Sequence, residues 1–260
     1  MNLFDDENKI IEHFQRIQDK EVFFPSLDDE IESLYRSIHE TAEWTNWTYS
    51  AGKDDPPPDY YNDVISVMMD VMRVDDHAFL SKKGKVINPT NAGESKLRKE
   101  LDESGILELF PNCKEVFINA KTLLPTEEDH NYTFYKENFA RVVREHAKKI
   151  ELYKQNHPGY KTVFFVMDES SAYFRIYDKS IKIEEGKGVK GAPHLFFFDK
   201  SFVDVMQDAQ IDYLIWYAPF KLLRTKDGIF TMPQAVIYNI HEIDFEDIEY
   251  DQSEMRSSEV

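Results

Sequence analysis

DVISVMMDVMRV, residues 63–74, is a nearly continuous apolar run that is rich in β-branched side chains. Such a run predicts a strand buried on both faces, because a half-exposed strand would alternate polar and apolar residues. Asp70 and Arg73 interrupt the run. An unpaired charge in a protein interior costs several kcal/mol, so a charged residue here is expected to be paired, to lie at a strand end, or to belong to a site. Asp70 is therefore the first candidate site residue.

Helical and strand patterns alternate along the rest of the chain. Two helices precede the run, and Ser26 can cap the second of them. The longest helix is predicted over roughly residues 135–155, and shorter helices are predicted at 94–104 and 202–208. Further strands are predicted at 114–121, 162–167, 172–177, 213–217 and 235–240. Strands separated by helices predict an α/β (mixed α+β) protein with a central mixed sheet flanked by helices.

The domain organisation follows from composition. The prolines at 56–58 mark a loop, since proline supplies no amide donor, and this loop is the one plausible internal boundary. We expect residues 1–240 to form a single α/β domain with an N-terminal helical segment. Residues 241–260 hold eight acidic residues and one arginine. We expect them to form an acidic, flexible tail.

The chain is strongly acidic throughout its length. Its 260 residues carry a formal net charge of −18, and the last twenty contribute −7, so the first 240 still carry −11. Such a surface disfavours non-specific nucleic-acid binding, which depends on clustered lysine and arginine. An acidic body can nevertheless contain a small basic groove, so a nucleic-acid partner is disfavoured and not excluded.

Compartment and redox state can also be predicted. Cys113 is the single cysteine, which rules out an intramolecular disulfide and thiol-only zinc sites. No apolar run approaches the ~18 residues that a membrane span requires. The first residues are acidic where a signal peptide would be basic and then apolar. We therefore expect a cytoplasmic protein that does not contact a membrane.

A second group of candidate residues lies at the end of the strand predicted at 114–121. Asn119 and Lys121 are two residues apart, so their side chains share one face of that strand. Together with Asp70 and with Glu32 on the second helix, they form a pattern that resembles the PD-(D/E)XK nuclease-like superfamily, over roughly residues 26–168. That family has a glutamate on an early helix, an aspartate on one strand and an acid-x-lysine on the next, followed by a helix and a further strand.

The resemblance implies a restriction-endonuclease-like fold and Mg²⁺-dependent cleavage of nucleic-acid phosphodiesters. Glu32 and Asp70 would help to bind Mg²⁺, which activates a water and neutralises phosphate charge. Lys121 would stabilise the attacking water or the phosphate. Asn119 stands where the family has an acid, and a neutral amide binds Mg²⁺ less well. The motif is therefore degenerate: either another acid substitutes, or catalysis has been lost.

Each candidate also has a plainer interpretation. Asp70 can pair with Arg73, and Lys121 can be a solvated lysine at a strand end. The segment 168–171, Asp-Glu-Ser-Ser, favours a turn between two hairpin strands. The segment 75–77, Asp-Asp-His, resembles a metal-ligand cluster but has no partner at helical or strand spacing, which favours a solvated turn. His146 lies on the apolar stripe of the longest helix and is most simply a core or edge histidine.

The alternative function is that of a non-catalytic, acidic binding protein. Trp44, Trp47, Tyr60 and Tyr61 could grip a basic protein partner, because tryptophan and tyrosine are enriched at interface hot spots, or the acidic surface could mimic nucleic acid. The plainer interpretation is that Trp44 and Trp47 pack against the end of the second helix. An enzyme acting on a small molecule also remains open, since an α/β fold is compatible with many chemistries.

Overall fold

A seven-stranded mixed sheet forms the centre of the structure, a computed structural model that describes residues 7–26, 28–50, 58–77, 79–81, 83–110, 112, 130–177, 191–225 and 228–258. The strand order is β1-β13-β10-β7-β4-β3-β2. The strands are β1 (Val22–Phe23), β2 (Trp47–Tyr49), β3 (Tyr60–Asn62), β4 (Val67–Val74), β7 (Lys161–Asp168), β10 (Tyr213–Tyr217) and β13 (Ala235–Asn239). The predicted α/β class with a central mixed sheet is confirmed.

The three central strands, β4, β7 and β10, run parallel to one another. The strands on either side of this core, β3 and β13, are antiparallel to their central neighbours. All three central strands are buried on both faces, as their apolar sequences predict. The carboxyl ends of β4, β7 and β10 therefore meet at one edge of the sheet, where α/β proteins commonly place their sites.

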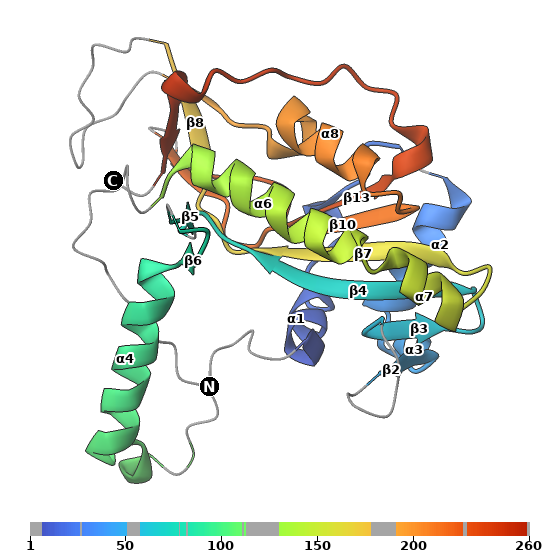
Figure 1. Ribbon diagram of the computed structural model, residues 1–260, viewed down its shortest axis with the longest axis horizontal. Helices are drawn as coiled ribbons and strands as arrows, with labels where there is room; N and C mark the ends of the chain where they lie inside the picture. Colours follow the sequence, from blue (N-terminus) through green and yellow to red (C-terminus); the bar gives the residue numbers. More distant parts are fainter. Residues whose placement is uncertain are drawn as a thin grey trace.

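Helices cover both faces of this sheet (Figure 1). On one face α1 (Glu7–Phe14) and α2 (Asp29–His39) pack against alternate residues of β4, such as Met69 and Val71. On the other face α6 (Tyr132–Ala147), α7 (Ile150–Asn156) and α8 (Lys200–Asp208) pack against Met68 and Met72. Asp70 is two residues away from each of these methionines along the strand, so its side chain lies on the same face of the sheet, covered by α6.

Smaller elements surround the central sheet. β8 (Tyr173–Ile176) lies between β9 (Gly191–Pro193) and β14 (Met255–Ser257), β5 (Phe79–Leu80) pairs with β6 (Val86–Ile87), and β11 (Leu222–Thr225) pairs with β12 (Gly228–Thr231). The remaining helices are α3 (Thr41–Trp44) and α4 (Pro89–Ser104), of which α4 extends away from the sheet in Figure 1.

Since β8 pairs with β9 and β14, the predicted hairpin around residues 168–171 is wrong.

Several predicted boundaries change in the structure. The strand predicted at 63–74 begins only at Val67, because residues 63–66 form a turn that closes with Ser66 in the left-handed region, φ 52°. The longest helix divides into α6 and α7 at Lys148 and Lys149. The apolar stripe did not indicate this break, since Ile150 and Tyr153 beyond it are buried as well.

The acidic C-terminal segment is not a free tail between residues 241 and 258. Its apolar residues Ile243, Phe245 and Tyr250 pack against the core on the α6 face, and β14 pairs with β8. Acidic residues between them are exposed or half-buried. The apolar residues spaced through the acidic segment therefore anchor it to the core. The expectation of a flexible tail was wrong for these residues. The expectation of a single domain stays a prediction.

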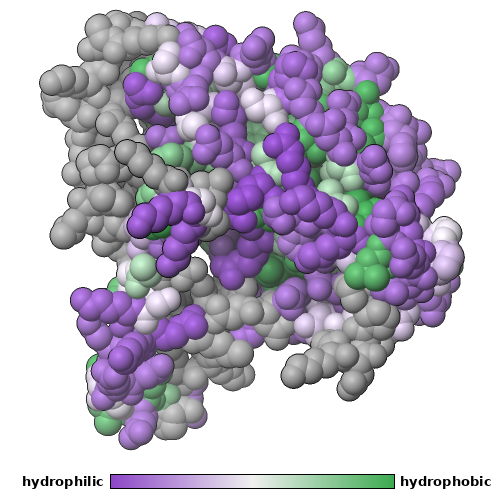
Figure 2. All heavy atoms as spheres, viewed as in Figure 1, coloured by the Kyte–Doolittle hydropathy of each residue, from purple (hydrophilic) through white to green (hydrophobic). Residues whose placement is uncertain are grey.

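The surface is mostly polar on the face shown in Figure 2. Among the described residues, no helix is both long enough and apolar enough to cross a membrane.

The second helix provides a first stability prediction. Its N-cap is Asp28 and not the predicted Ser26: the Asp28 Oδ1 atom accepts the Ile31 N–H at 2.7 Å. We expect Asp28→Ala to lower the free energy of unfolding by about 1 kcal/mol, since the helix loses its capping bond. Ser26→Ala, the matched control, is expected to change it by less than about 0.5 kcal/mol. Urea unfolding of both variants measures the difference, and equal effects would contradict the assignment.

Candidate functional site

The residues predicted from sequence do not meet in one place within the described chain. Glu32 lies on α2 with its side chain 47% exposed and forms an ion pair with Arg36 at 2.8 Å. Its helix covers the face opposite to Asp70. Asn119 and Lys121, together with the strand predicted at 114–121, lie outside the described residues. Glu32 and Asp70 are therefore not brought together to share one ion.

Asp70 is buried within β4 and contacts two groups from the helices above it. Its Oδ2 atom lies 2.5 Å from His146 Nδ1 and accepts the Tyr153 hydroxyl at 2.8 Å. Arg73, the partner considered from sequence, instead pairs with Glu169 at 2.7 Å. Burial, together with the Asp70 charge, raises the pKa of Tyr153, so this hydroxyl remains a hydrogen-bond donor. His146 is thus a partner of the strand carboxylate and part of a polar cluster.

Asp59 is the acid that the sequence interpretation missed. It immediately precedes Tyr60, which pairs with Met69, so the antiparallel register of β3 and β4 places Asp59 beside Asp70. Its Oδ2 atom accepts the Val71 N–H at 2.8 Å, and its carboxyl group lies close enough to that of Asp70 for the two charges to repel each other. Burial, and then the negative charge of Asp70, raise the pKa of Asp59 to about 7. Two carboxyl groups this close can share a proton or a cation.

A third acid acts on Asp59. Glu7, the first residue of α1, adds its negative charge to the effects that raise the pKa of Asp59. Its Oε2 atom accepts the Tyr49 hydroxyl at 3.0 Å, which holds the carboxylate against β2. The sequence signal for Asp59 is the dipeptide Pro58-Asp59, which ends the proline loop and directly precedes β3, a strand that the sequence pattern does not predict.

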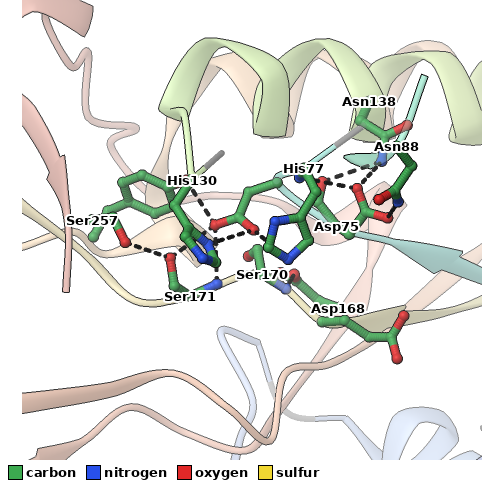
Figure 3. Close-up of polar contacts among 12 residues, drawn as sticks. Asp75, His77, Asn88, His130, Asn138, Asp168, Ser170, Ser171 and Ser257 are labelled. Carbon is green, nitrogen blue, oxygen red and sulfur yellow. Dashed lines mark hydrogen bonds and ion pairs between the residues drawn. The ribbon is translucent and has the colours of Figure 1, made fainter. Parts of the chain in front are cut away.

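A different cluster lies beyond the end of β4. The Asp76 Oδ1 atom is 3.2 Å from His130 Nδ1 and 3.5 Å from His77 Nε2, and one ligand atom of each residue lies within 4.8 Å of the others. In Figure 3 the rings of His77 and His130 are seen side by side. Asp76 is fully buried. Although burial opposes its charge, the hydrogen bond and charge of His130, followed by the charge of His77, hold the pKa of Asp76 at about 2.

This cluster was noticed in part from sequence. The segment 75–77 suggested metal ligands, but no partner stood at helical or strand spacing. The partner is His130, which the fold brings back to β4 at the start of α6, where Asn131 N–H donates to the Asp76 carbonyl. Asp75 steadies the turn: it accepts from Asn88 at 2.8 Å and from Asn138 at 3.2 Å (Figure 3).

A buried ion pair lies next to the same edge of the sheet. Lys221 Nζ is 3.2 Å from Asp168 Oδ2 and 2.5 Å from Ser170 Oγ, and all three side chains are buried. Asp168 also accepts the Tyr135 hydroxyl at 2.5 Å and the Trp216 indole N–H at 2.8 Å. Burial lowers the pKa of Lys221, and the Asp168 charge opposes that effect. Because Ser170 has no exposed surface, we assign this group a structural role.

The aromatic residues considered for partner binding are mostly internal. Trp47 and Tyr60 are buried, and the Trp47 indole N–H donates to the Ser37 carbonyl of α2 at 3.0 Å. Trp44 stacks on Trp47 with ring centroids 5.7 Å apart. This arrangement agrees with the plainer interpretation, in which the two tryptophans pack against the second helix. Capture of a basic partner remains a prediction.

Comparison with protein-family models, with curated proteins and with solved structures found no match to this chain.

Proposed function

We propose that this chain is a metal-dependent, nuclease-like protein that acts on nucleic-acid phosphodiesters, with Mg²⁺ held between Asp59 and Asp70. The observation that carries the proposal is the placement of these two carboxyl groups side by side on neighbouring antiparallel strands. Mg²⁺ is commonly bound by one or two carboxylates together with substrate phosphate oxygens. A cation between the two groups would also remove their mutual repulsion.

In this proposal, residues other than those chosen from the sequence occupy the positions of the PD-(D/E)XK pattern. Asp59, after Pro58, takes the place of the first strand aspartate, and Asp70 becomes the acid of the acid-x-lysine pattern on the next strand, β4. Glu7 is the early-helix glutamate whose charge acts on Asp59, although α1, like α2, covers the face of the sheet opposite to Asp70. After β4 the chain first forms β5, β6 and α4; α6, α7 and β7 then come in the helix-then-strand order that the family has. This element order supports a restriction-endonuclease-like architecture, which we include in the proposal, and Asn119 and Lys121 are no longer needed.

One position departs from the family pattern. Met72 stands where the pattern requires lysine, and it lies on the same face of β4 as Asp70. The basic group in contact with Asp70 is instead His146, whose side chain is 24% exposed and so can be reached by solvent. We assign to His146 the role of orienting or deprotonating the attacking water. A histidine in place of lysine makes slow cleavage the expected behaviour.

The proposal is tested with a panel of single- and double-stranded DNA and RNA, in Mg²⁺ and in Mn²⁺. We expect wild type to cleave at least one substrate, and Asp59→Asn and Asp70→Asn to be at least about 100-fold slower, since each loses a metal-binding carboxylate. Asp63→Asn, an exposed acid bonded to Tyr160, is the matched control and should retain the wild-type rate.

Metal binding is measured on the same four proteins by titration calorimetry with Mn²⁺. Equal rates and equal Mn²⁺ affinities in all four would refute the proposal. Mn²⁺ binding that depends on Asp59 and Asp70, without cleavage of any substrate, would refute the catalytic part and leave a metal-binding, degenerate nuclease fold.

A further inference from the structure

Two of the three distances among the ligand atoms of Asp76, His77 and His130 match the spacing of ligands around a single ion, and all three lie within 4.8 Å. In a tetrahedral site with metal–ligand bonds of about 2.0–2.1 Å, neighbouring ligand atoms lie roughly 3.3–3.5 Å apart. The Asp76 Oδ1 atom is 3.2 Å from His130 Nδ1 and 3.5 Å from His77 Nε2. Small movements of the two imidazoles would complete the arrangement, since their side chains are only partly buried, at 14% and 15% exposure.

The carboxylate of Asp76 is already oriented for this role. Its Oδ2 atom accepts the Ser171 N–H at 3.1 Å, the Ser171 hydroxyl at 2.8 Å and the Tyr173 hydroxyl at 2.8 Å. These donors leave Oδ1 directed at the two imidazoles. Hydrogen bonds from surrounding residues that fix a ligand in this way are typical of metal sites. Ser171 is held in turn by Ser257 of β14, at 2.8 Å.

We propose that Asp76, His77 and His130 form a binding site for a transition-metal ion of the Zn²⁺ class. Two imidazoles and one carboxylate suit Zn²⁺ and its neighbours, whereas Mg²⁺ and Ca²⁺ prefer oxygen ligands. Four of the six steps from Asp70 to Asp76 run along β4, roughly 13 Å of extended chain, so this site is distinct from the proposed Mg²⁺ site. Three protein ligands leave a fourth coordination position for water or a substrate atom.

The ion would join three segments that are distant in sequence. Asp76 and His77 follow β4, His130 precedes α6, and Asp76 is anchored to Ser171 and Tyr173 at the start of β8. Binding of the ion would therefore stabilise the carboxyl-end edge of the sheet. The same edge carries the ends of β4 and β7, so an open coordination position there could also take part in chemistry.

The test is Zn²⁺ titration of the full, chelator-treated chain by calorimetry, with excess Mg²⁺ present to occupy the acidic surface. We expect wild type to bind one equivalent of Zn²⁺, and His77→Gln and His130→Gln each to weaken binding at least about tenfold. His241→Gln is the matched control, because His241 is an exposed histidine that also pairs with an aspartate, Asp212, at 2.9 Å. It should bind like wild type.

Two further measurements keep the outcome unambiguous. Far-UV circular dichroism confirms that the variants are folded, and the visible spectrum of the Co²⁺-loaded chain should show a low-coordinate N/O site that both variants lose. Absence of a stoichiometric Zn²⁺ site in wild type, or equal affinity in all the histidine variants, would overturn the proposal. Asp59→Asn changes the proposed Mg²⁺ site only, so it should leave Zn²⁺ binding unchanged. The Zn²⁺ proposal can therefore hold even if the nuclease proposal fails.

Discussion

Asp59→Asn is expected to raise the free energy of unfolding by about 2 kcal/mol at pH 8 in metal-free buffer. The folded-state pKa of Asp59 is raised to about 7 from an ordinary 3.8, first by burial and then by the charge of Asp70. Each pKa unit corresponds to about 1.4 kcal/mol, so the full difference is about 4 kcal/mol. Because Asp59 is only partly buried, we reduce this to about 2 kcal/mol.

The sign of the pH dependence follows from which state binds the proton more tightly. A raised pKa means that the folded chain holds the proton better than the unfolded chain does. Wild type therefore loses stability relative to Asp59→Asn as the pH rises from about 4 to about 7, and the difference is constant above that range. The amide of the variant keeps an oxygen for the Val71 N–H and can donate to Asp70, so no new unsatisfied group arises.

Guanidinium unfolding of both proteins at several pH values measures this difference, with Asp63→Asn as the surface control. Mg²⁺ should stabilise wild type at pH 8 and leave Asp59→Asn nearly unchanged, since the ion would replace the missing positive charge between the carboxylates. A variant that is less stable than wild type at pH 8 would show that the two carboxyl groups do not repel each other in the folded chain.

The buried strands were predictable because their signal is local. The strands predicted at 162–167, 213–217 and 235–240 match β7, β10 and β13 to within about one residue. A strand covered on both faces needs an unbroken apolar run, and such a run can be recognised without knowledge of its neighbours. The short strand β3, which lies between β4 and the edge strand β2, was missed for the opposite reason. Its three residues, Tyr60–Asn62, follow prolines and gain their strand geometry by pairing with β2 and β4.

The candidate sites depend on pairings that no local pattern reveals. Asp70 was found because a charge within an apolar run is conspicuous, but its neighbour Asp59 could be recognised only once β3 was known. Asp76 and His77 were noticed as possible ligands and set aside, since His130 is far away in sequence. The helix that carries Tyr132 returns the chain to the end of β4 and brings His130 with it. Tertiary topology, and not spacing, therefore assembles both sites.

Lys221→Met is expected to lower the free energy of unfolding by about 3–5 kcal/mol. The substitution removes the cation of a buried ion pair and leaves Asp168 without its counter-charge, a loss that is much larger than that of an exposed pair. Lys221 also lies over the Tyr135 ring, 4.5 Å from its centroid, so the cation has a second partner in the core. The methionine side chain fills a similar volume, which limits the contribution of a cavity.

Lys200→Met is the matched control, because Lys200 pairs with Asp204 at 2.9 Å on the surface and its loss should cost at most about 1 kcal/mol. The double variant Lys221→Met with Asp168→Asn separates charge from packing. If the unpaired carboxylate causes the loss, the double variant should be more stable than Lys221→Met alone, since no buried charge remains. The alternative result is a double variant whose loss of stability relative to wild type equals the sum of the losses in Lys221→Met and Asp168→Asn. That result would show that Asp168 stabilises the fold through its bonds to Tyr135 and Trp216, independently of the lysine.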